Sequence, residues 1–199
     1  MIVITNPDAI VNEINIIDSL LEEGLSLLHI RKPGFSAIEM GQFIHQIQLK
    51  FRANLVLHTH HELAEDFGIT KIHFSESGRK NTLDLPAKFS KPCRYKSTST
   101  HCIENFNMLE NFDYAFLSPV FKSISKENYF PKKDHFESLR FRTNTTTKIV
   151  ALGGIDVENI EVTLKNGFDD IALLGAIWNN DNPLKKFKSC QRIVHSSLV

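Results

Sequence analysis

Short apolar runs alternate with helix-like apolar patterns along the whole chain. Strands that are buried on both faces are continuously apolar, so eight of these runs predict parallel strands. They are Ile2–Thr5, Leu27–Arg31, Leu55–His58, Lys71–Phe74, Arg94–Thr98, Tyr114–Leu117, Ile149–Leu152 and Ile171–Leu174.

Apolar residues spaced three or four apart predict helices between the strands. The stripes are Ile10, Ile14, Ile17 and Leu21, then Met40, Ile44, Ile47 and Phe51, and later Val157, Ile160 and Leu164. Asp156 is a predicted N-cap for the third, which ends before Gly167. A closing helix is predicted after Pro183, and a short helix with irregular flanks within 75–92.

Strands that alternate with helices form a parallel sheet, and eight of them favour a closed (β/α)8 TIM barrel. With 199 residues, 42% of them hydrophobic, the chain fits a single compact domain spanning 1–199. This is shorter than the roughly 250 residues typical of such barrels, so short loops are expected. The exception is the polar stretch 121–134, whose length predicts a binding loop.

Charge and composition exclude several classes of protein. Lys plus Arg equals Asp plus Glu at 23 each, so no basic field favours nucleic acid or an anionic membrane. No apolar run reaches the roughly 20 residues that span a bilayer. The start, Met1 to Thr5, predicts a strand rather than a signal peptide. Cys93, Cys102 and Cys190 form no motif, which predicts reduced thiols in a cytoplasmic protein.

Glycines follow the last two predicted strands. Gly153 and Gly154 end the seventh and Gly175 ends the eighth. Glycine lets backbone N–H groups approach a ligand closely, and the loops after strands seven and eight of a TIM barrel are a recurring phosphate site. The pattern predicts a phosphorylated ligand.

The other strand ends carry histidine, hydroxyl and cationic side chains and few carboxylates. Arg31 and Lys126 are predicted to hold phosphate. With few carboxylates, the strand ends suit a Mg²⁺-bound substrate less well. His58 and His60 share a face if their strand continues. With His29 or His73 they could bind a transition metal, or one could be a general base. The remaining histidines expected on solvated faces are His45, His61, His135 and His195.

Five blocks resemble the thiamine phosphate synthase family and its thiazole tautomerase relatives. They are LLHIRKPG, LVLHTHHELAEDFGITKIHFSE, STSTHCIENF, DYAFLSPVFKSISK and IVALGGIDVENI with GFDDIALLGAIW. The resemblance implies a barrel that handles thiazole phosphate. In true synthases it implies Mg²⁺-dependent coupling to a pyrimidine pyrophosphate, with pyrophosphate leaving. A homo-oligomer is also consistent with the family.

The phosphate side of the family pattern is retained. Gly153 and Gly154 match its glycine pair, Lys126 its loop lysine, Ser99 its hydroxyl after strand five, and Arg31 its motif arginine. By this resemblance the predicted phosphate- or substrate-binding residues are Arg31, Lys32, Ser99, Ser123, Lys126, Gly153, Gly154 and Gly175.

The opposite half of the pattern is changed. His29 replaces a glutamine, His58-Thr59 replaces an Asn-Asp pair, and a second metal aspartate aligns near Gly78, with Glu76 as a weak substitute. Because Mg²⁺ is anchored by carboxylates, these changes predict impaired coupling. The metal-free tautomerase branch has a histidine where this chain has Pro119.

We therefore expect a thiamine-biosynthesis protein that binds thiazole phosphate or thiamine phosphate and transfers a proton with His29, His58 or His60. No cofactor is expected unless synthase activity, with Mg²⁺, is retained. The alternatives are an active synthase, a non-catalytic binding relative and a metal-dependent hydrolase built on the histidines.

Overall fold

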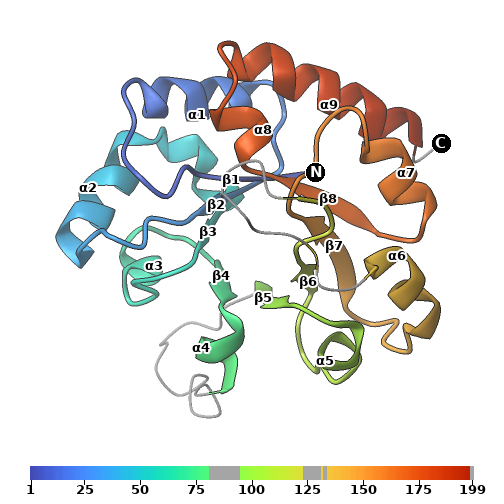
Figure 1. The fold of residues 1–199 in the computed structure, drawn as a ribbon. Coiled ribbons are helices and arrows are strands. Elements are labelled where there is room, and N and C mark those ends of the chain that lie inside the picture. Colours follow the sequence, from blue (N-terminus) through green and yellow to red (C-terminus); the bar gives the residue numbers. More distant parts are fainter. Residues whose placement is uncertain (81–94, 123–130, 132–133, 198–199) are drawn as a thin grey trace.

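The computed structural model describes residues 1–80, 95–122, 131 and 134–197 and shows a closed barrel of eight parallel strands, β1 to β8 in sequence order (Figure 1). The strands are β1 Ile2–Ile4, β2 Leu27–Ile30, β3 Leu55–Leu57, β4 Lys71–Phe74, β5 Tyr95–Thr100, β6 Tyr114–Leu117, β7 Lys148–Leu152 and β8 Asp170–Leu173. The predicted fold class and strand order are confirmed.

Helices surround the barrel (Figure 1). They are α1 Glu13–Glu22, α2 Ala37–Gln46, η1 Leu49–Asn54, α3 Leu63–Asp66, α4 Glu76–Lys80, α5 Ile103–Asn107, α6 His135–Ser138, η3 Leu139–Phe141, α7 Ile160–Lys165, α8 Gly175–Trp178 and α9 Pro183–Ser197. The capping box of Ser36 and Glu39 starts α2. No helix in the described ranges is long and apolar enough to cross a membrane.

Two cores follow from the alternation of side chains along each strand. One fills the barrel interior and consists of Ile2, Ile4, Tyr114, Phe116, Val150 and Ala172. The other lies between strands and helices and includes Leu28, Ile30, Leu55 and Leu57. In β2 this alternation sends Leu28 and Ile30 toward the helices and leaves His29, fully buried, for the barrel interior.

The barrel closes where β1 pairs with β8. The amino group of Met1 lies 2.7 Å from the Asp170 carboxylate, and the Trp178 indole in α8 donates to the carbonyl of Ile4 at 2.7 Å. Side-chain and terminal contacts therefore reinforce the seam between the first and last strands.

Three local expectations need correction. Helix α7 begins at Ile160 with Asn159 as its N-cap, because Asp156 binds the N–H of Val157 and forms a separate turn. His135 is buried in α6, where it was expected in solvent. His61 is partly buried and contacts the carbonyls of Leu57 and His73.

The cysteine prediction is tested only in part. Cys102 and Cys190 are free, whereas Cys93 and the segment 81–94 lie outside the described residues. So does most of the predicted binding loop, 121–134.

Candidate active site

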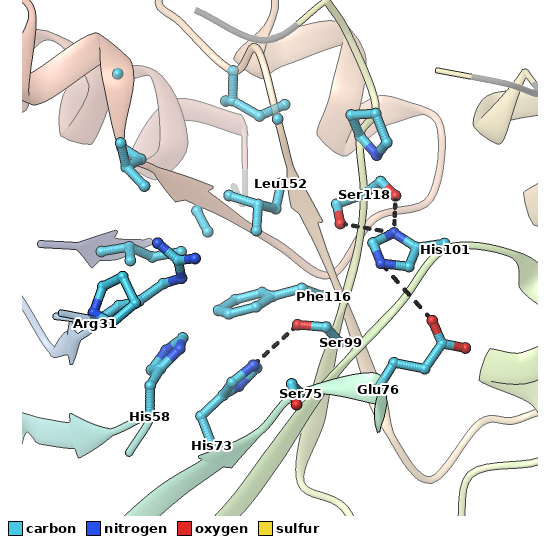
Figure 2. A pocket seen from close by; sticks show the side chains of 18 of the residues that line it. Arg31, His58, His73, Ser75, Glu76, Ser99, His101, Phe116, Ser118 and Leu152 are labelled. Carbon is cyan, nitrogen blue, oxygen red and sulfur yellow. Dashed lines mark hydrogen bonds and ion pairs between the residues drawn. The ribbon is translucent and has the colours of Figure 1, made fainter. Parts of the chain in front are cut away.

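A cavity of about 760 Å³ opens at the carboxyl ends of the strands, the face on which TIM barrels carry their sites (Figure 2). Polar and glycine residues at its wall are Arg31, His58, Thr59, His73, Ser75, Glu76, Ser77, Ser99, His101, Ser118, Gly153, Gly154 and Gly175. Figure 2 shows Arg31, His58 and His73 on one side and Ser118 and His101 on the other, with Phe116 and Leu152 between them.

One side of the cavity, here called the glycine side, exposes backbone rather than side chains. It consists of Gly153, Gly154 and Gly175. Gly153 and Gly154 have φ of +99° and +67°, a region that favours glycine. The segment after β6 lies against them, and Phe121 donates its N–H to the carbonyl of Gly153 at 3.0 Å. A Cβ on Gly153 would come within 2.8 Å of Pro119, and one on Gly154 would collide with the carbonyl of Lys122.

This packing leaves backbone amides available at the turn. Within the described residues, neither Gly153 nor Gly154 donates a backbone hydrogen bond, and Asn159 holds the turn by donating to the carbonyl of Gly154 at 2.9 Å. Bare N–H groups at a tight turn are suited to an anion.

Arg31 supplies the positive charge. Its backbone is fixed by Thr5, whose Oγ1 accepts from the Arg31 N–H at 2.9 Å. In the part of the chain that the structure describes, the guanidinium has no hydrogen-bond or ion-pair partner, and it lines the cavity. An unpaired arginine beside a cavity is suited to binding phosphate. Because Arg31 follows β2, it lines a different sector of the mouth from the glycines after β7 and β8.

Three histidines from neighbouring strands meet below Arg31. The Nδ1 of His29 lies 2.8 Å from the Nε2 of His58, and the Nε2 of His29 lies 2.7 Å from the Tyr114 hydroxyl. His73 contacts Ser97 through Nδ1 at 2.9 Å and Ser99 through Nε2 at 3.0 Å. Of the three, His58 and His73 line the cavity and His29 lies behind them.

These histidines are neutral at pH 7. Burial lowers the pKa of His73 to about 3, with the charges of His61 and Arg31 acting in the same direction. Burial, followed by the neighbouring histidines and Arg31, lowers the pKa of His58 well below its usual value. The pKa of His29 falls for the same main reason. Neutral imidazoles can accept or donate a proton or bind a metal.

The orientation of the rings disfavours a shared metal ion. Ring nitrogens of His29, His58 and His73 lie within 4.8 Å of one another, but the rings of His58 and His73 stack 4.1 Å apart with an interplanar angle of 22°. A ligating nitrogen bonds a metal in the plane of its ring at about 2 Å. Two nearly parallel planes at this separation do not aim at one ion.

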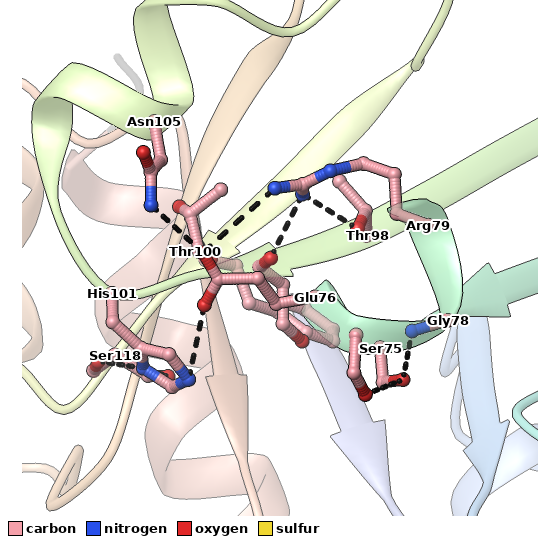
Figure 3. Close-up of polar contacts among 12 residues, drawn as sticks. Ser75, Glu76, Gly78, Arg79, Thr98, Thr100, His101, Asn105 and Ser118 are labelled. Atoms are coloured by element: carbon pink, nitrogen blue, oxygen red, sulfur yellow. Dashed lines mark hydrogen bonds and ion pairs between the residues drawn. The ribbon is translucent and has the colours of Figure 1, made fainter. Parts of the chain in front are cut away.

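On the far side, Glu76 is the sole carboxylate among the described residues of the cavity wall (Figure 3). Asn105 donates to it at 2.8 Å, and Arg79 lies 3.9 Å away. His101 donates through Nδ1 to the carbonyl of Ser118 at 2.7 Å and places Nε2 3.8 Å from Glu76. The carboxylate therefore already serves as a partner for protein groups.

Several predicted residues lie elsewhere. Lys32 is fully buried in an ion pair with Glu13 at 2.6 Å and does not line the cavity. His60 has φ of 53° and contacts the carbonyl of Phe35 at 2.8 Å, so it is not among the described lining residues. Ser123 and Lys126 lie outside the described residues. Arg31, Ser99, Gly153, Gly154 and Gly175 all reach the cavity.

The sequence offered a further signal for two residues that are not among the predicted catalytic or phosphate-binding residues. His73 and His101 stand at or just beyond the ends of β4 and β5, at the level of the mouth. The sequence pattern predicts this position for both residues. It does not predict the hydrogen bonds that distinguish His73 from His101.

Comparison with known proteins agrees with the barrel fold. The model of the family described as thiamine monophosphate synthase matches residues 1–177. The thiamine-phosphate synthase of Staphylococcus haemolyticus is 27% identical over 188 residues, which cover 87% of this chain and 86% of that protein. That of Caldicellulosiruptor saccharolyticus is 25% identical and covers 92% and 84%.

Solved structures give the same picture. The thiamine phosphate pyrophosphorylase of Bacteroides thetaiotaomicron has a TM-score of 0.76 and 27% identity, with 98% of this chain and 97% of that chain covered. The Pyrococcus furiosus protein has a TM-score of 0.80 at 19% identity, covering 100% and 96%, and supports the fold alone. The chain belongs to the thiamine monophosphate synthase family.

Proposed function

We propose that this protein binds a thiazole phosphate or thiamine phosphate and catalyses a tautomerase-like proton transfer, with little Mg²⁺-dependent coupling. One observation carries the proposal. Among the described residues, an arginine without a side-chain partner and glycine amides without an acceptor line the same cavity as neutral histidines, and the carboxylate of that wall is already bound by protein groups.

The glycine side supports phosphate binding. The amides of Gly153, Gly154 and Gly175 would hold phosphate oxygens, as expected for the turns after the last two strands of a barrel. Arg31 would supply a charge-assisted hydrogen bond from another sector of the mouth, and the Ser99 hydroxyl a neutral one. Phe116 and Leu152 line the cavity between the two sides and would contact a flat, partly apolar ligand body (Figure 2).

The histidines support proton transfer. His58 and His101 line the cavity from opposite sides, and each keeps one ring nitrogen without a protein hydrogen bond in the described structure. Both nitrogens of His73 are bound by serines, which leaves it less available. His29 is a relay candidate behind His58, while the lack of cavity contact makes His60 the weakest of the predicted catalytic residues.

The described residues of the cavity wall do not favour Mg²⁺. A magnesium site needs one or two carboxylates free to bind the ion. Thr59 follows His58 where the family has a carboxylate, and Glu76 is held by Asn105 with Arg79 nearby. A cation from outside would have to displace these partners.

The test is conversion of the thiazole phosphate tautomer, followed by proton NMR with metal chelated. Wild-type protein is expected to convert it, and His58→Gln to lower the rate about a hundredfold, because His58 lines the cavity. His45→Gln, an exposed histidine of α2, is the matched control. If each of the single variants His29→Gln, His58→Gln and His60→Gln converts the tautomer at the wild-type rate, the proton-transfer role predicted for these three residues is wrong.

The relatives named thiamine-phosphate synthase favour a second function, full coupling. An assay with both substrates and Mg²⁺ decides between them, because turnover at ordinary enzyme rates contradicts the impaired-coupling part of the proposal. Phosphate-ligand binding without turnover in either assay would indicate a non-catalytic relative.

A further inference from the structure

His58 and His101, which line opposite sides of the cavity, are held by different partners. Behind His58, a hydrogen-bonded chain runs into the barrel through His29 to Tyr114, with distances of 2.8 and 2.7 Å. His29 is 0% exposed and Tyr114 is 8% exposed, so water does not compete for these bonds. His101 instead binds a backbone carbonyl, that of Ser118.

Counting protons gives the chain a direction. Each neutral imidazole has one N–H and one bare nitrogen. If the Tyr114 hydroxyl donates to Nε2 of His29, then His29 must carry its proton on Nδ1 and donate to Nε2 of His58. The only nitrogen left to carry the proton of His58 is Nδ1.

The opposite direction is disfavoured at Tyr114. If Nε2 of His29 donated to the phenol oxygen, the phenol proton would have to go to another oxygen. The neighbouring hydroxyl is that of Ser97. The oxygen of Ser97 is already in contact with His73 at 2.9 Å. An imidazole nitrogen is also a stronger base than a hydroxyl oxygen, so the phenol proton goes to His29.

His101 has the opposite free nitrogen. A carbonyl oxygen only accepts, so Nδ1 of His101 must carry the proton that binds Ser118. Neutral His101 therefore has a bare Nε2, which lies 3.8 Å from Glu76. A proton taken onto Nε2 would give an imidazolium ion beside a carboxylate. The side chain of His101 is 52% exposed, which leaves it open to a ligand.

From these contacts we infer that His101 is the proton acceptor, and that His58 is a neutral hydrogen-bond donor fixed by the positioning residues His29 and Tyr114. The inference rests on the proposed function. His101 takes a proton from one atom of the ligand onto Nε2 and returns it to another, so the protein ends unchanged and no co-reactant is needed. Meanwhile Nδ1–H of His58 stabilises negative charge that develops on the ligand.

Nitrogen-15 NMR of the histidine side chains reads the protonated nitrogen directly. In wild-type protein the expected result is Nδ1–H for both His58 and His101. Tyr114→Phe removes the phenol and keeps the ring, so His58 should become a mixture of the two N–H forms while His101 is unchanged. The control is Tyr95→Phe, a half-exposed tyrosine of β5. A proton on Nε2 of either histidine in the wild-type protein overturns the inference.

Kinetics test the roles. His101→Gln is expected to lower kcat about a hundredfold, and Tyr114→Phe about tenfold with KM unchanged. Full activity of His101→Gln would overturn the assignment of the base. If wild-type protein does not convert the thiazole phosphate at all, the proposed function fails. His101 then has no role as a proton acceptor, while the NMR result still decides separately whether the contacts fix Nδ1–H on both histidines.

Discussion

The glycine side and the histidine side of the cavity are built from different materials. On the glycine side, Gly153 and Gly154 present backbone amides, and the segment after β6 leaves no room for a Cβ. On the histidine side, His58 and His73 present side chains supported by hydrogen bonds. Changing the first requires moving the backbone, whereas changing the second requires only new side chains that fit the interior. One barrel can therefore keep its glycine turn while the side chains across the cavity differ.

The largest effect is expected from Gly154→Ala. The new Cβ would meet the carbonyl of Lys122 and lie 2.7 Å from Phe121, at a φ of +67°. We expect a loss of about 3 kcal/mol or more in the free energy of unfolding, from strain and collision together. Urea unfolding followed by circular dichroism measures it.

Gly68→Ala separates the two causes. Gly68 has nearly the same φ, +66°, but a Cβ at this position would have no neighbour within 4 Å. The conformational cost alone is about 1–2 kcal/mol. Equal losses in the two variants would show that close packing does not constrain the glycine side.

The next effect concerns acid stability of the histidine side. His29, His58 and His73 have lowered pKa values in the folded protein, so the unfolded chain binds more protons below pH 6.5. Stability should therefore fall as pH drops from about 6.5 toward the folded-state pKa, which is about 3 for His73. Each histidine contributes a slope of up to about 1.4 kcal/mol per pH unit.

Unfolding free energies at a series of pH values check this slope. His73→Gln should be less stable at pH 7 but should lose less stability on acidification than the wild-type protein. His45→Gln, on the exposed face of α2, should keep the wild-type slope. Identical slopes in all three proteins would contradict burial of neutral His73.

A smaller effect links the two sides. Arg31→Ala should weaken binding of inorganic phosphate about tenfold, because it removes a charged donor from the mouth. It should also raise the pKa of His58, since the Arg31 charge helps to lower it. Isothermal titration measures the first effect and histidine NMR the second, with exposed Arg192→Ala as control. Unchanged phosphate affinity would place the anion entirely on the glycines.

Much of the fold could be predicted from the sequence because its signals are local. Each strand is a short apolar run, and the turn at Gly153 and Gly154 follows directly from the glycine pair. Alternation could also have located Lys32: with His29 and Arg31 directed to the interior and mouth, its position falls on the helix side, where Glu13 pairs with it.

The failures involve distant partners or a strand that stops early. His60 shares a face with His58 only if β3 continues, and β3 ends at Leu57. The contact between His29 and Tyr114 joins residues 85 positions apart. No local pattern indicates which nitrogen of a histidine such a partner will occupy, so the chemistry of the site depended on three-dimensional contacts.

A single fluorescent side chain, that of Trp178, lies at the seam between the first and last strands of the barrel. Trp178 is the one tryptophan of the sequence, and its indole N–H donates to the carbonyl of Ile4 across the junction of first and last strands. Emission from this ring depends on whether it is enclosed or in water. Intrinsic fluorescence therefore follows closure of the ring of strands, separately from the helix content that circular dichroism records.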